Sequence, residues 1–127
     1  MFHFPLERLH FAAQFGIGAV WVFHGLYSKI LNGIPRHRLI VGRILGKKRA
    51  LAATRTIGLL ELLLGMWAIA DWHPMWCAGV QTAAIVAMNF LEILLARELL
   101  ISAPGMAVLN LGFLSLVWWW ASFGMRA

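Results

Sequence analysis

Five polar residues stand inside otherwise apolar stretches of the chain, and they are its candidates for chemistry: His24, Glu61, Asn89, Glu92 and Asn110. Glu61 is the most isolated, because only apolar residues and glycine surround it from residue 57 to residue 70. A carboxyl group inside a membrane costs about 3 kcal/mol on insertion scales, so it requires a partner, a proton or a watery cavity. An imidazole and a carboxyl group placed in this way could exchange protons with a bound molecule.

The composition predicts the elements that must hold these residues. Of the 127 residues, 61% are hydrophobic and 13% are charged, and this charged share is about half that of a soluble domain. Four membrane-spanning helices of about 20 residues would use roughly 80 residues of the chain. We therefore predict an all-α fold, with residues 1–127 forming a single integral membrane domain of four transmembrane helices in an antiparallel up-down bundle. The spans are expected at about residues 6–31, 54–70, 75–96 and 106–123.

Basic residues cluster between the first and second predicted spans. Eight of the eleven lysines and arginines fall between Lys29 and Arg55, and Arg97 lies in the other loop on the same side of the membrane. Cytoplasmic loops carry the excess of Lys and Arg, so we predict that both termini lie outside the cytoplasm. Residues 36–49 mix these charges with apolar residues near helical spacing. This pattern favours a short amphipathic helix on an anionic membrane surface over a solvated basic loop.

The predicted topology brings the five polar residues to one depth. At about 1.5 Å per residue, His24 and Glu61 each lie roughly 10 Å from the cytoplasmic ends of their spans, and the other three fall in the same layer. Lipid would penalise each of them, so we predict one polar cluster inside the bundle. Tyr27 and Lys29 are expected at its cytoplasmic mouth. Tyr27 is placed there because residues three apart share a face of an α-helix.

Two segments resemble the paired signatures of the DoxX-like family of small four-helix membrane proteins. They are residues 21–29, with the sequence WVFHGLYSK, and residues 58–65, with the sequence GLLELLLG. His24, Gly25 and Lys29 match the family's His-Gly with a nearby lysine, and Glu61 matches its intramembrane glutamate. The resemblance implies a bacterial inner (cytoplasmic) membrane protein, with relatives that include a subunit of a thiosulfate:quinone oxidoreductase. It implies a fold more firmly than a reaction.

Two classes of function remain open. In the first, the bundle binds a quinone-like or lipid-like molecule whose polar head exchanges protons with His24 and Glu61, and a soluble redox partner docks on the cytoplasmic basic loop. In the second, the protein is a non-enzymatic interaction or assembly protein, and the polar cluster only fixes the packing of the helices. The sequence does not decide whether the protein is an enzyme.

The sequence also bounds the cofactors and partners. A quinone is the candidate cofactor. We expect no metal site, because His24 and the two buried carboxylates lack the paired spacing of metal ligands. The single cysteine, Cys77, excludes a disulfide within the chain. We expect membrane lipid as a partner, with a second copy of the chain as a further candidate, and no nucleic acid.

Overall fold

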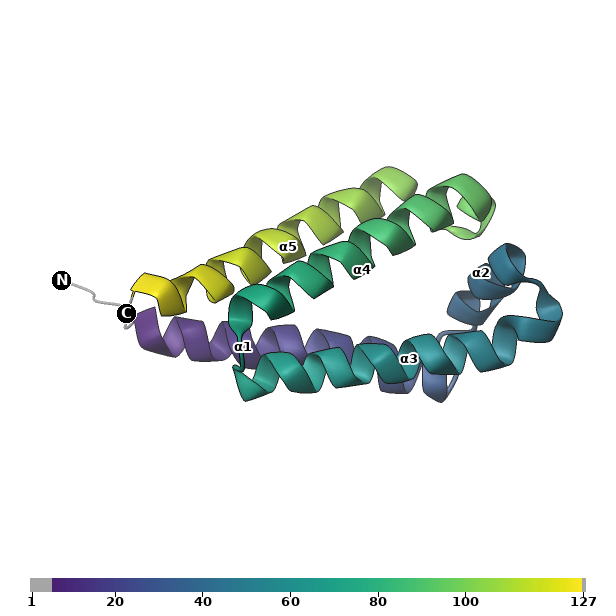
Figure 1. The fold of residues 1–127 in the computed structure, drawn as a ribbon. Coiled ribbons are helices and arrows are strands. Elements are labelled where there is room, and N and C mark those ends of the chain that lie inside the picture. The colour runs from purple at the N-terminus through teal and green to yellow at the C-terminus, as the bar shows by residue number, and fades with distance from the viewer. Residues whose placement is uncertain (1–5, 127) are drawn as a thin grey trace.

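The computed structural model describes residues 6–126, with side chains through Phe123, and this part of the chain is helical with no strand. The all-α prediction is confirmed. The described residues form five α-helices (Figure 1), a π-helix, η1, which continues α1, and a short 3-10 helix, η2, which lies between α4 and α5. In chain order the elements are α1 (Leu6–Val22), η1 (Phe23–Ile30), α2 (Pro35–Leu45), α3 (Lys47–Ala70), α4 (Pro74–Leu95), η2 (Arg97–Leu99) and α5 (Ala103–Arg126).

Four helical stretches of the described residues are long and apolar enough to cross a membrane: Leu6–Ile30, Lys47–Ala70, Pro74–Leu95 and Ala103–Phe123. They correspond to the four predicted spans. The second begins at Lys47 rather than near residue 54, because the lysine, arginine, alanine and leucine residues that precede residue 54 are all good helix formers. Gly46, with a φ of 95°, separates it from α2.

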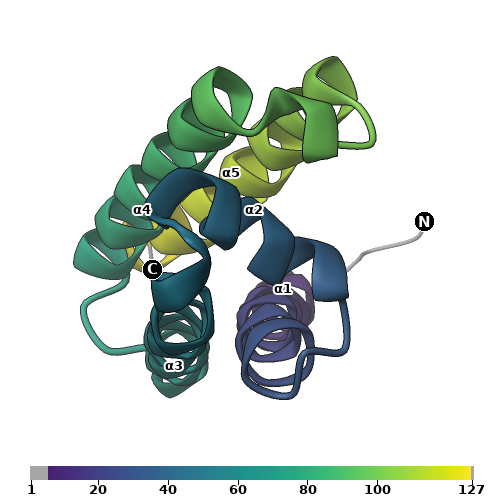
Figure 2. The ribbon, with the colours of Figure 1, turned by 90° about the vertical axis from the view of Figure 1, so that its right-hand side faces the viewer.

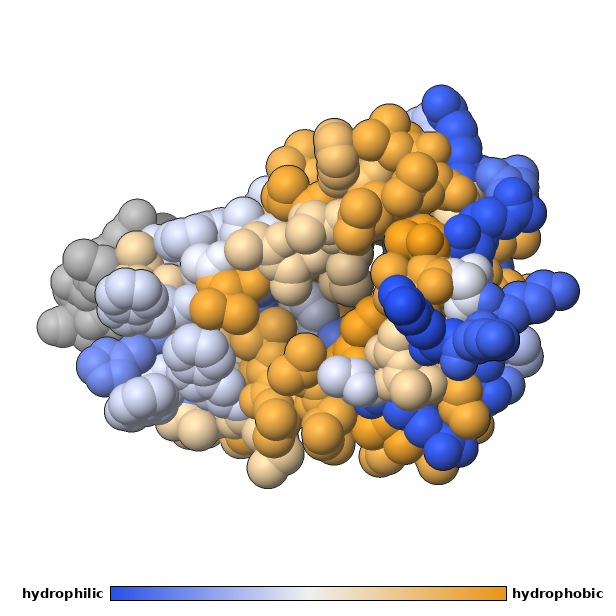
Figure 3. Space-filling view, turned by 45° about the vertical axis from the view of Figure 1, so that its right-hand side comes forward, coloured by the Kyte–Doolittle hydropathy of each residue, from blue (hydrophilic) through white to orange (hydrophobic). Residues whose placement is uncertain are grey.

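The ends of the molecule differ in character. The start of α1, the turn between α3 and α4 and the end of α5 lie at one end, which we call the terminal end (Figure 1). Helices α2 and η2 lie at the other, the α2 end. In Figure 3 hydrophobic residues cover the sides of the helices, and hydrophilic residues gather at the α2 end. This distribution is that of a protein whose helices are surrounded by lipid.

Helix α2 differs from the surface helix predicted for residues 36–49. It ends at Leu45, and the remaining basic residues belong to α3. It crosses the α2 end of the bundle (Figure 2) and buries Ile40 and Val41 against its neighbours. Arg43 forms an ion pair with Glu98 of η2 at 2.5 Å. The apolar residues of α2 therefore cover the end of the bundle.

Glycines bring the first and second spans into close contact. A Cβ on Gly58 would lie 2.6 Å from the carbonyl oxygen of Gly25, and a Cβ on Gly65 would lie 2.7 Å from that of Gly18. Small residues at both crossing points allow the two backbones to touch, as is common between membrane helices. The α1–η1 segment and α3 therefore form one tight pair.

Helices α4 and α5 form a second pair, which meets the first at the terminal end. There His10 Nε2 lies 3.1 Å from the carbonyl oxygen of Trp120, and the Trp120 side chain is fully buried. Deeper in the bundle, Trp21 Nε1 donates a hydrogen bond to Gln81 Oε1 at 2.7 Å. Beyond these contacts the two pairs diverge toward the α2 end (Figure 1). The divergence makes the space in which the candidate site lies.

Candidate functional site

A cavity of about 580 Å³ lies between the two helix pairs, next to α2. Its volume is within the range of sites for small molecules. All five residues of the predicted polar cluster line it: His24, Glu61, Asn89, Glu92 and Asn110. They come from four different helices. The packing of the bundle, rather than a local sequence motif, therefore brings them together.

Glu61 has Lys29 as its partner. The Lys29 Nζ atom lies 2.6 Å from Glu61 Oε1, and both side chains are buried, with 11% and 6% of their surfaces exposed. Apart from this ion pair, the buried Oε1 atom has no hydrogen-bond partner within the described residues, so it retains capacity to accept a bond from another donor. A buried charge that loses its partner is strongly destabilising. Lys29 is therefore part of the site rather than only its border.

The π-helix η1 explains how Lys29 reaches this position. In an α-helix, residues five apart lie roughly 140° apart around the axis. In η1 each N–H group bonds to the carbonyl five residues back, so His24 and Lys29 lie nearly in line, and both face the cavity. Such π-helical turns are frequent at functional sites.

The same geometry affects where Tyr27 lies, which was predicted at the mouth of the cluster. That prediction assumed the spacing of an α-helix, in which Tyr27 would share the face of His24. In the wider turn of η1, Tyr27 does not line the cavity. Its side chain is half-exposed, stacks on Phe23 and lies over Gly33.

Two asparagines join α4 to α5 at the cavity wall. Asn110 Nδ2 donates a hydrogen bond to Asn89 Oδ1 at 2.8 Å. Glu92 lies one turn from Asn89 on α4, lines the same cavity, and forms no ion pair within the described residues. The amide pair therefore stabilises the α4–α5 contact, while Glu92 adds a second carboxyl group to the wall.

Helix α2 contributes two residues that the sequence analysis missed, Arg36 and His37. The His37 ring stacks on that of His24 with centroids 5.9 Å apart, and its Nδ1 atom is buried without a hydrogen-bond partner. Burial, together with the positive charges of Lys29 and Arg36, lowers the pKa of His37 from 6.5 to about 4. The only sequence feature that could have pointed to these two residues was their position directly after Pro35. That position did not reveal that α2 folds across the bundle.

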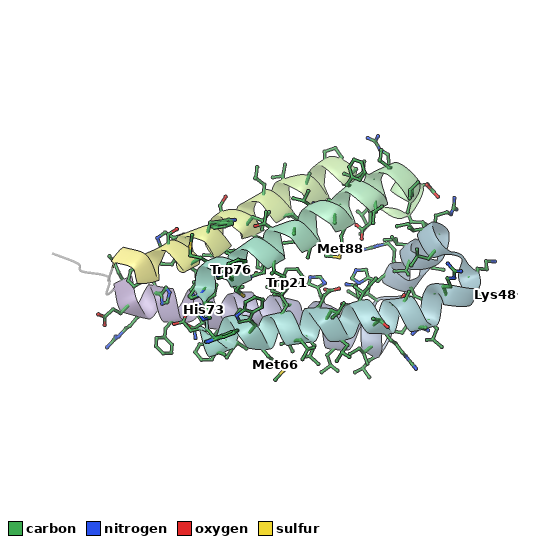
Figure 4. All side chains as sticks on the ribbon, viewed as in Figure 1. Trp21, Lys48, Met66, His73, Trp76 and Met88 are labelled. Atoms are coloured by element: carbon green, nitrogen blue, oxygen red, sulfur yellow. The ribbon has the colours of Figure 1, made fainter. Side chains whose placement is uncertain are left out.

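The opposite part of the cavity is apolar. Val20, Trp21, Ile85 and Phe113 line it, and the Trp21 and Phe113 rings meet edge to face with centroids 6.2 Å apart. Trp21 and Met88 lie in the space between the helix pairs (Figure 4). Gln81, a third residue that the sequence analysis missed, adds no charge to the cavity but accepts the hydrogen bond that holds the Trp21 indole in place. The cavity thus has a polar part near α2 and an aromatic, apolar part toward the terminal end.

No group of three His, Cys, Asp or Glu side chains is close enough to hold a metal ion in the part of the chain that the structure describes. Cys77 is fully buried in the core, where its thiol contacts the Gln81 amide at 3.3 Å. Its environment is that of a packing residue.

The fold and this intramembrane cavity define a multi-pass helical membrane protein with a polar site between its spans. The model of the DoxX-like family matches residues 18–118, so the chain belongs to the DoxX-like family. The matched region contains every residue of the polar cluster. No curated protein and no solved structure significantly matches the chain.

The lowered pKa of His37 predicts a pH dependence of stability. Because the neutral form is favoured in the folded protein, the contribution of His37 is fully present above pH 6.5 and is lost as the pH falls from 6.5 toward 4. The wild-type unfolding midpoint in detergent should therefore fall over this interval, and it should fall less in His37→Gln. Equal pH dependence in the two proteins would contradict the assignment.

Proposed function

We propose that this protein is a redox-associated membrane subunit that binds a quinone-like or lipid-like molecule in its intramembrane cavity. The observation that carries the proposal is the shape of the cavity: a volume of about 580 Å³, with ionisable side chains in one part and aromatic side chains in the other. Binding sites for small molecules are mostly apolar pockets with a few convergent polar groups. An amphiphile would place its head near His24 and Glu61 and its ring or tail near Trp21.

The polar residues suit the chemistry of a quinone head. Reduction of a quinone to a quinol takes up two electrons and two protons. His24 and the carboxylates of the cavity would relay the protons, each group taking up a proton and passing it on, since both types of group transfer protons readily when placed within hydrogen-bond reach. The chain offers no dithiol, because Cys77 is its only cysteine. The electrons would come from a soluble redox partner that docks on the basic α2 end.

The proposal includes a location in a bacterial inner membrane, with the α2 end in the cytoplasm and both termini outside. The excess of Lys and Arg at the α2 end supports this orientation. Lys48→Cys in a Cys77→Ser background should react with a membrane-impermeant maleimide only after the cells are opened. Labelling of Lys48→Cys in intact spheroplasts would reverse the orientation.

The binding proposal is tested by native mass spectrometry of the protein released from membranes with its lipids. We expect a quinone or another amphiphile to be retained by the wild type and lost from His24→Ala. Leu111→Ala is the control, because Leu111 is exposed on α5 and does not line the cavity. A wild-type protein that carries no small molecule, and that takes up none when decylubiquinone is added, would refute the proposal.

A second candidate function, a purely structural role for the polar cluster, is favoured by two contacts. Lys29 pairs with Glu61, and Asn89 pairs with Asn110, so four of the polar side chains already have partners. Polar pairs between membrane helices contribute about 1 kcal/mol, which is enough to fix helix packing. On this reading the protein is an interaction or assembly protein, and variants of His24 would leave every cellular function intact.

A further inference from the structure

The cavity is lined by equal numbers of basic (Lys, Arg) and acidic (Glu) side chains, and this restricts the net charge of a molecule that it would hold. Lys29 and Glu61 neutralise each other at 2.6 Å, while Arg36 and Glu92 add one basic and one acidic side chain to the wall. His37 is neutral at neutral pH because its pKa is about 4. A ligand with a net charge would meet repulsion as well as attraction from these side chains. Its loss of hydration would therefore be poorly compensated.

The same wall offers hydrogen bonds to a neutral head. The bond between Asn110 Nδ2 and Asn89 Oδ1 uses one donor and one acceptor. It leaves the Asn89 amide nitrogen and the Asn110 amide oxygen without a partner among the hydrogen bonds of the described residues. The buried His37 Nδ1 is also unpartnered. A head that carries carbonyl or hydroxyl oxygens would satisfy these groups without introducing a charge.

The rim of the cavity shows where such a molecule would enter. Leu109 lines the cavity and yet is 75% exposed. A side chain that both borders a cavity and faces outward marks its opening. Leu109 lies within the membrane-spanning part of α5, so this opening faces the hydrocarbon of the bilayer. At the α2 end, in contrast, helix α2 crosses the end of the bundle (Figure 2), and its Arg36 and His37 line the polar part of the cavity.

We propose that the cavity selects a neutral amphiphile whose head carries carbonyl or hydroxyl oxygens, and that this molecule enters sideways from the bilayer past Leu109. The inference rests on the proposed function of the cavity as a ligand site, and it deepens that function by naming the class of ligand and its route. Quinones and acylglycerols share this chemistry. Fatty acids and long-chain amines do not, because they carry a charge.

Ligand class is tested with four probes added to the purified wild-type protein in dodecyl maltoside: decylubiquinone, monoolein, oleate and oleylamine. Native mass spectrometry measures the fraction of protein that carries each probe as its concentration rises. We expect at least one neutral probe to bind at a concentration tenfold lower than either charged probe. Binding of oleate or oleylamine that equals or exceeds the neutral probes would overturn the inference.

The four probes separate this inference from the proposed function. If monoolein binds and decylubiquinone does not, the neutral-head inference holds and the quinone role fails. If oleate binds most tightly, the cavity is still a ligand site, but the inference about its ligand fails. If no probe binds, both fail.

The route is tested with a matched pair of variants on α5. Leu109→Trp narrows the opening, and Leu111→Trp places the same bulk on an exposed position that does not line the cavity. In nanodiscs loaded with the best neutral probe, we expect Leu109→Trp to slow uptake at least fivefold and Leu111→Trp to leave it unchanged. Equal uptake by both variants would exclude this opening as the route. Both positions are exposed, so the core stays intact in either variant.

Discussion

Glu61→Gln should lower the free energy of unfolding by about 3 kcal/mol, because it leaves the buried ammonium group of Lys29 without its counter-charge. The two groups lie 2.6 Å apart and are nearly excluded from solvent. The loss would be measured by unfolding the purified protein with increasing amounts of a denaturing detergent. A glutamine keeps the size of the side chain, so the effect reports the charge and not the packing.

The double variant Lys29→Met/Glu61→Gln is the matched control for this ion pair. It removes both charges, and replacement of a complete buried pair by uncharged residues is often neutral for stability. We therefore expect it to recover most of the lost stability. If Glu61→Gln alone is as stable as the wild type, the pair does not hold the helices together. Ligand binding by the stable double variant would show that neither charge is needed in the cavity.

A second large effect is expected for Gly58→Ala, where the first and second spans cross. The new Cβ would lie 2.6 Å from the carbonyl oxygen of Gly25, and that oxygen is backbone, so it cannot rotate away. Because the two helices must move apart, the free energy of unfolding should fall by about 2 kcal/mol, which is in the range measured for overpacked cores. The separation would also pull Lys29 away from Glu61, so ligand binding should weaken along with stability.

Gly112→Ala is the control for the glycine contact. A Cβ at Gly112, in the middle of α5, would have no neighbour within 4 Å. Alanine favours the helix over glycine by up to about 1 kcal/mol, so this variant should be at least as stable as the wild type. Equal losses in Gly58→Ala and Gly112→Ala, measured in the same detergent titration, would show that close approach at Gly58 is unimportant.

The sequence predicted the helical fold and its four long apolar helices well, because a membrane environment requires both. Apolar stretches of this length must be helical in a membrane, since every backbone polar group has to be bonded within the segment. The layer of five polar residues followed from the same logic, and all five line one cavity. Their role as a ligand site remains a proposal.

The partner of Glu61 could not be predicted from the sequence. Depth alone placed several polar residues at the level of the carboxyl group, and the choice among them depends on how each helix is rotated. Lys29 was expected at the mouth of the cluster, and its ion pair with the carboxylate was not predicted. The position of α2 was missed for a similar reason. Amphipathic spacing predicts that one face of residues 36–49 packs against an apolar surface. It does not show whether that surface is lipid or the end of the helix bundle.

The π-helix also fixes the register of the first span as a whole. Ile17, Trp21 and His24 follow α-helical spacing toward the bundle interior, and the next position in that series is Ser28. The wider turn of η1 accommodates an extra residue, so that Lys29 also turns inward. Deletion of one residue between His24 and Ser28 would let the segment relax to an ordinary helix, with Lys29 moved to position 28. The charge that neutralises Glu61 thus depends on the number of residues in one turn, as well as on their identity.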